Sequence, residues 1–144
     1  MADNRDAIID AIVARMETIR TANGFQTDAG ERVSRWRSTD PGESACPAID
    51  VRDPDRKPKG VYSQNLRDYE LAVEIAAFSA GGVDTDGELN RILEDILKAV
   101  LEGDLTWGAL AINTVFESDR KGLSQMGAKV GVAVARFLIH YRKQ

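Results

Sequence analysis

The stretch from Thr21 to Arg37, TANGFQTDAGERVSRWR, joins an expected helix to an expected strand through two turns. Asn23 and Gly24 can supply the left-handed residue that commonly ends a helix, and residues 28–30 form a second turn signal. The run that follows is β-prone but rich in arginine, at Arg32, Arg35 and Arg37. A strand with so many arginines has little to bury, so we expect it at a sheet edge or facing a partner.

Two amphipathic helices are expected, one at the start of the chain and one between the strongest strand and the last two strands. In each, apolar residues recur at three- and four-residue spacing and therefore lie on one stripe. The stripe of the first helix holds Ile8, Ile9, Ile12, Val13, Met16 and Ile19, and that of the second Leu89, Ile92, Leu93, Ile96, Leu97 and Val100. Asp3 or Asn4 can cap the first helix. Thr85 and Glu88 have the spacing of a capping box at the start of the second, which we expect to end at Gly103.

Alternation of apolar and polar residues predicts the strands. The strongest run is Tyr69 to Phe78, preceded by a short run around Ile49 and Val51. A further run spans Leu110 to Phe116, and the last begins with Val132 and Val134 and continues through Phe137, Ile139 and Tyr141. This order predicts a two-layer α+β domain. We expect a mostly antiparallel mixed sheet of about four to five strands, with two helices packed on one face.

The chain of 144 residues is expected to form a single domain, 1–144, with two mobile loops. Residues 52–65 contain two prolines, a glycine and several charged residues, a composition typical of solvated loops. Residues 117–128 contain Gly122 and Gly127 and few apolar residues. Neither segment offers enough apolar surface to offset the entropy of ordering its backbone, so we expect both to be mobile.

Composition limits the classes of function. The net charge of −4 and the pI of about 5.0 argue against a broad surface that grips nucleic-acid phosphates. No apolar run approaches the ~18 residues that a membrane span needs, so no membrane partner is expected. A single cysteine, Cys46, excludes an internal disulfide and fits a reducing compartment.

We expect no catalytic residue, metal or cofactor. His140 is the only histidine and Cys46 the only cysteine, so neither a nucleophile–base pair nor a transition-metal ligand set is evident. The acidic side of the second helix could in principle hold a divalent cation, but a solvated helical face explains it more simply. Charged residues are instead the candidates for a subunit or partner interface. They are Arg32, Arg35, Arg37, Arg56, Lys57, Lys59, Arg120, Lys121, Glu94 and Asp95.

Six segments taken in order resemble the small phage tail terminator family, also called minor tail protein U-like or tail-completion proteins. They are RDAIIDAIVARMETI (5–19), TANGFQTDAGERVSRWR (21–37), NLRDYELAVEIAAF (65–78), GELNRILEDILKAVLEGD (87–104), GALAINTVFES (108–118) and VGVAVARFLIHY (130–141). The resemblance spans roughly residues 5–141. It lies in the order and spacing of elements rather than in a catalytic signature.

The resemblance implies a structural protein of a phage or prophage. Such a protein caps the tail tube, ends its polymerisation and provides the surface to which the head is joined. Its partners would be other copies of itself in a ring, expected to be a hexamer on the tail and a monomer or loose oligomer in solution. Further partners would be the tail tube protein and head–tail connector proteins, with DNA passing through the ring without specific binding. It would reside in the virion tail, and in the bacterial host cytoplasm during assembly.

Two other classes of function stay open at the level of sequence. The first is another neck or head–tail connector protein, because such proteins share α+β folds and ring assembly. The second is a small ligand-binding or enzymatic α+β domain with a polar pocket at the edge of the sheet.

Overall fold

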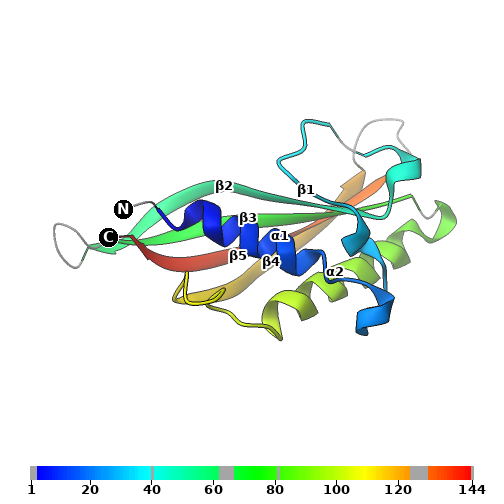
Figure 1. Ribbon diagram of the computed structural model, residues 1–144. Helices are drawn as coiled ribbons and strands as arrows, with labels where there is room; N and C mark the ends of the chain where they lie inside the picture. Colours follow the sequence, from blue (N-terminus) through cyan, green and yellow to red (C-terminus); the bar gives the residue numbers. More distant parts are fainter. Residues whose placement is uncertain (1–2, 40, 62–66, 81, 124–129, 144) are drawn as a thin grey trace.

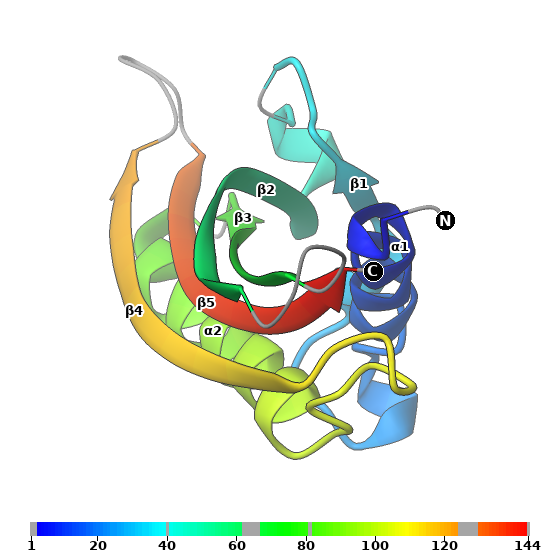
Figure 2. The same cartoon turned by 90° about the vertical axis from the view of Figure 1, so that its left-hand side faces the viewer.

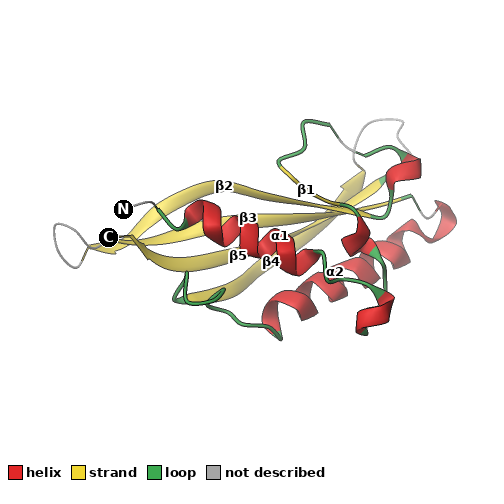
Figure 3. Ribbon diagram, viewed as in Figure 1, coloured by secondary structure: helices red, strands yellow, loops and turns green. Residues whose placement is uncertain are grey.

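A computed structural model describes residues 3–39, 41–61, 67–80, 82–123 and 130–143, and in it two helices pack against a five-stranded mixed sheet (Figures 1 and 3). The helices are α1 (Arg5–Met16) and α2 (Thr85–Leu101). The strands are β1 (Val33–Arg35), β2 (Ala48–Val61), β3 (Arg67–Ser79), β4 (Asn113–Leu123) and β5 (Gly131–Lys143). Short 3-10 turns occupy Thr21–Asn23, Ala29–Glu31, Glu43–Ala45 and Gly82–Asp84. The expected α+β class is confirmed.

The strands lie in the order β1-β2-β3-β5-β4. Neighbours are antiparallel except β1 and β2, which run parallel. The basic strand β1 is at an edge, as its composition predicts, and β4 forms the opposite edge. Figure 2 looks along the strands and shows a strongly curved sheet, with β1 and β4 on opposite sides of the molecule.

The core lies between one face of the sheet and both helices. On β3, the expected inward positions Leu71, Val73 and Ile75 are at most 1% exposed. They pair across to Ile139, Phe137 and Ala135 of β5, which share the same core. The apolar stripes of α1 and α2 cover this face, and each fully buried Ile or Leu contributes roughly 1.5–3 kcal/mol.

The first half of β5 differs from the expected pattern. Ala133 and Ala135 point into the core, whereas Val132 and Val134 lie half-buried on the other face. Small residues are needed here because α2 approaches closely. A Cβ at Gly131 would come within 2.6 Å of Cγ2 of Thr85 and 3.0 Å of Cδ1 of Leu89.

The start of α1 uses the expected Asp3 contact, whereas the start of α2 and the position of Gly24 differ from expectation. Asp84 precedes α2, and the capping box is absent because the Glu88 carboxylate accepts a hydrogen bond from the Ser79 hydroxyl at 2.6 Å. At the start of α1, Oδ1 of Asp3 accepts the backbone N–H of Arg5 at 2.9 Å. Gly24 does adopt the left-handed conformation, with φ of 89°, but it ends the short turn Thr21–Asn23 rather than α1.

The prediction that residues 52–65 and 117–128 are loops is wrong for the parts that the structure describes, which are strands. Residues 52–61 belong to β2 and pair with β3, and residues 117–123 belong to β4 and pair with β5. The prolines fit because the β2–β3 register shifts between Arg52 and Asp55 and again between Pro58 and Gly60, and proline is tolerated at such irregularities. Residues 62–66 and 124–129 lie outside the described residues.

None of the described helices is both long enough and apolar enough to cross a membrane.

Candidate interaction surface

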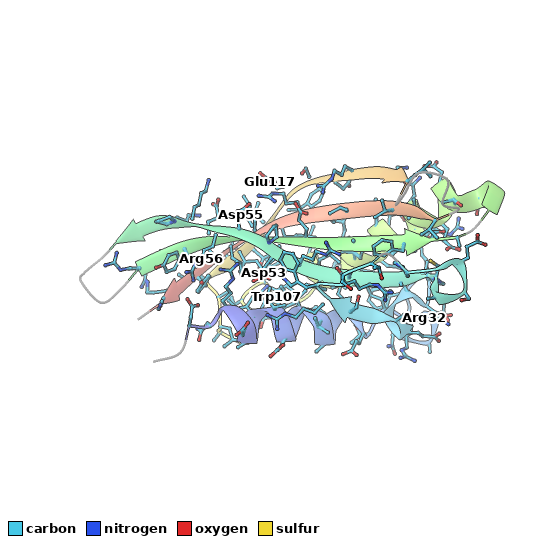
Figure 4. The ribbon with its side chains drawn as sticks, turned by 90° about the horizontal axis from the view of Figure 1, so that it is seen from above. Arg32, Asp53, Asp55, Arg56, Trp107 and Glu117 are labelled. Carbon is cyan, nitrogen blue, oxygen red and sulfur yellow. The ribbon has the colours of Figure 1, made fainter. Side chains whose placement is uncertain are left out.

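The face of the sheet opposite α1 and α2, here called the outer face, carries alternating charged and apolar side chains. It includes Glu70, Glu74 and Phe78 of β3 and Arg136 and Leu138 of β5. A short segment around Cys46 covers one end, near Ala76 and Phe78. Figure 4 views the molecule from above, with Asp55 and Glu117 on this side.

Arg136 lies at the centre of the outer face, among three carboxylates from three strands. Its guanidinium donates to Glu117 at 2.5 Å, Glu74 at 2.9 Å and Asp55 at 3.3 Å. Partial burial acts to lower the pKa of Arg136, but the hydrogen bonds to these carboxylates outweigh it and the pKa is raised. The cluster fixes the relative positions of β2, β3, β5 and β4.

Asp68 is a second fixed charge, near the other end of the outer face. It is fully buried, and its carboxylate accepts a hydrogen bond from Nε of Arg142 at 2.6 Å and contacts Nε2 of His140 at 2.5 Å. The Arg142 hydrogen bond, aided by His140, lowers the pKa of Asp68 to about 2 despite burial. His140 is therefore engaged in a structural contact.

Arg56 is directed inward by β2 rather than presented on a loop. Its guanidinium donates to Oδ2 of Asp3 at 2.6 Å and to the Tyr141 hydroxyl at 2.7 Å, and it stacks 4.3 Å from the centre of the Tyr69 ring. These contacts tie the N-terminus to the sheet. The pKa of Tyr141 is raised, and burial of its hydroxyl is the largest cause.

Lys57 and Lys59 remain accessible at the end of β2. Both face Glu70, with Nζ–carboxylate distances of 3.3 Å and 3.9 Å. The side chains are 72% and 48% exposed, so these pairs contribute little to stability and leave the ammonium groups open to a partner.

The three arginines around β1 differ in their contacts. Arg35 bridges Asp6 at 2.7 Å and Asp10 at 3.1 Å, which joins β1 to α1. Arg37 donates from its guanidinium to the carbonyl of Thr39 at 2.8 Å and from its backbone N–H to Oδ1 of Asp50 at 3.0 Å. Within the described part of the chain, neither the Arg32 nor the Arg37 guanidinium has a carboxylate partner.

Arg120 and Lys121 lie on β4, where they point to opposite faces. Arg120 contacts Glu74 at 3.5 Å on the outer face. Lys121 binds Asp86 at 2.5 Å and Oδ1 of Asn90 at 2.8 Å, so it connects β4 to the start of α2.

The two acidic candidates on α2 both bind the segment that follows α1. Glu94 accepts the side-chain amide of Gln26 at 2.7 Å. Asp95 is 1% exposed and accepts the backbone N–H groups of Gln26 and Thr27, at 3.0 and 2.8 Å, and the Thr27 hydroxyl. Asp95 is thus a buried structural residue that no partner can reach in this subunit.

Two features of the surface were not identified from the sequence. Trp36 is 49% exposed beside the basic residues of β1. At the opposite edge of the sheet, a hollow of about 390 Å³ opens between the start of α2 and the ends of β4 and β5. We call it the Leu123 hollow, and it is lined by Thr85, Leu89, Lys121, Gly122, Leu123 and Gly131. A tryptophan among arginines in an expected edge strand was a usable signal, whereas the hollow depends on tertiary packing.

Two observations concern metal and thiol chemistry in the part of the chain that the structure describes. No three His, Cys, Asp or Glu side chains there are grouped so as to hold a metal ion. Burial raises the pKa of the Cys46 thiol, which makes it a weaker nucleophile at neutral pH.

The arrangement defines a small α+β domain with a charged, largely uncovered sheet face and two dissimilar edges. No protein-family model matches the chain, and no curated protein matches it. Among solved structures, a chain from a structure described as the virion of a native gene transfer agent (GTA) particle is similar, with a TM-score of 0.55. The match covers 94% of this chain and 98% of that chain at 13% identity, and it shows a shared fold.

Proposed function

We propose that the chain is a structural protein of a phage-like particle, and more specifically the terminator that caps its tail tube. The observation that carries the proposal is the fold match, which runs almost end to end along a chain of a gene transfer agent virion. A shared fold does not by itself define a function, so the surface has to support the same conclusion.

The surface supports a role in assembly. The two edges of the sheet differ, with short basic β1 on one side and longer β4 on the other. Two different surfaces on opposite sides suit a head-to-tail contact, which generates a ring when the rotation closes. The net charge of −4 also suits a ring through which DNA passes without adhering.

Deletion of the gene in the phage or particle-producing strain, followed by electron microscopy, tests the proposal. Loss of a terminator gives tails of uncontrolled length and filled heads without tails, and the intact gene restores normal particles. Purified wild-type tails should contain the chain by mass spectrometry. A complementing copy carrying Glu102→Gln, a change at an exposed helix end, serves as the matched control.

The same experiment separates the alternatives. Tails of normal length with unattached heads, and a chain that copurifies with heads, would assign it to the neck as a connector. Normal particles without the gene would exclude an assembly role and favour a small ligand-binding domain.

A further inference from the structure

We infer that Trp36 of one copy seats in the Leu123 hollow of the next copy, so that subunits join head to tail through opposite edges of the sheet. The inference rests on the proposed function, because a terminator ring requires a contact between successive copies and this pairing supplies it.

Trp36 has the properties of a preorganised anchor. Its side chain is 49% exposed, yet Nε1 donates to Oδ1 of Asp53 at 2.7 Å, and the Arg52 guanidinium lies 5.5 Å from the ring centre. Its backbone is held in the left-handed region, with φ of 54°, which a bulky residue rarely adopts. Strained residues of this kind cluster at binding sites, and a side chain already fixed loses little entropy on binding.

The Leu123 hollow is a suitable receptor for an aromatic side chain. Its volume of about 390 Å³ lies within the range of roughly 300–1,000 Å³ that small-ligand pockets occupy. Leu123, on its rim, is 72% exposed and is the most exposed large apolar residue in the described part of the chain. Exposed apolar surface next to a hollow is typical of an interaction site.

The positions of the two features favour a second copy as the occupant. Trp36 follows β1 and the hollow adjoins β4, so strands β2, β3 and β5 lie between them in the sheet. Figure 4 shows the two edges apart from each other, with Arg32 beside β1 and Glu117 on β4. Features on opposite edges cannot satisfy each other within one subunit, but they can join successive copies.

Charge complementarity supports the same pairing. Arg37 follows Trp36 directly, and its guanidinium has no carboxylate partner among the described residues of its own subunit. The first turn of α2, beside the hollow, carries Asp86, whose side chain is 80% exposed although it also pairs with Lys121 of its own subunit. Seating Trp36 would bring Arg37 toward the Asp86 carboxylate, an arrangement that favours the correct register between copies.

Complementary variants of the purified chain test the contact. Trp36→Ala removes the anchor and keeps the hollow, whereas Leu123→Glu blocks the hollow and keeps the anchor. At millimolar concentration, sedimentation should show oligomers of the wild-type chain and at least a tenfold loss of association for each variant alone. An equimolar mixture should restore a 1:1 dimer that does not grow, because each dimer has one intact contact and two blocked ends.

Two controls keep the result interpretable. Trp36→Gly, which accommodates the positive φ, should behave as Trp36→Ala and separates loss of the anchor from backbone strain. Leu101→Glu changes another exposed leucine, away from the hollow, and should assemble as the wild type does. A wild-type chain that stays monomeric, a Trp36→Ala variant that still assembles, or a mixture that stays monomeric would each overturn the inference. The tail phenotype of the gene deletion is scored separately, so failure of this contact and failure of the proposed function are distinguishable.

Discussion

Single residues on the outer face show how charge is used to hold the sheet. Arg136 neutralises carboxylates from β2, β3 and β4, and Asp68 is buried against the Arg142 guanidinium. A buried charge without a partner is costly, so removing either partner is more damaging than breaking an exposed ion pair. These residues are therefore expected to support the outer face rather than to meet a partner directly.

Asp68 provides a pH-dependent test of this view. Its pKa is about 2 in the folded chain against 3.8 unperturbed, so the ionised carboxylate stabilises the fold above pH 3.8 and that stabilisation is lost as the pH falls toward 2. We expect Asp68→Asn to lower the free energy of unfolding by about 2 kcal/mol at pH 7. Urea unfolding at pH 7, 4 and 2 should show the difference shrinking with pH. A difference that persists undiminished at pH 2 would contradict the ionic explanation.

At the scale of elements, much of the fold was predictable because the core depends on local patterns. The period-two run from Tyr69 to Phe78 and the stripes of both helices predicted their buried faces correctly. The second half of β2 was missed because it reads as a loop: Pro54, Pro58 and its charged residues are unfavourable for an isolated strand. The prolines are accommodated by shifts in the β2–β3 register, and the charge of Arg56 by its contacts with Asp3 and Tyr141. Both depend on a strand register that no local pattern contains. The Arg136 cluster was hidden for the same reason.

Backbone dynamics test the corrected assignment of β2. Residues 55–58 pair with residues 69–72 of β3, so we expect ¹⁵N order parameters near 0.85 for the non-proline residues, as in rigid backbone. Residues of β3 such as Val73 provide the internal reference. Order parameters below about 0.6 at Asp55 to Lys57 would restore the mobile-loop interpretation.

The apolar stripe of α2 allows two leucines to be compared. Leu93 is 6% exposed, and Leu97 is only partly buried at the edge of the core. We expect Leu93→Ala to cost ~2–5 kcal/mol, because it leaves a cavity, and Leu97→Ala to cost less. Urea unfolding of both variants measures the difference. Equal costs would mean that α2 is rotated relative to the sheet, and no effect of Leu93→Ala would place its stripe outside the core.

At the scale of the whole molecule, stability and assembly are expected to depend on different basic residues of the same strand. Arg56 is bound within the subunit, so Arg56→Gln should cost about 1.5–3 kcal/mol through its lost charged hydrogen bonds. Lys57 and Lys59 are exposed, so Lys57→Gln with Lys59→Gln should change the free energy of unfolding by less than ~0.5 kcal/mol per site. Urea unfolding separates the two expectations.

The same variants then connect the surface to the particle. If Lys57 and Lys59 contact an acidic neighbour, the double glutamine variant should fail to complete tails although it folds normally. Arg56→Gln should complete tails at a temperature where it remains folded. Particle yield from complemented deletion strains, counted by electron microscopy, gives the comparison. Normal completion by the lysine variant would restrict these lysines to their pairing with Glu70, and the contacts between copies would then have to lie elsewhere, at the edges formed by β1 and β4.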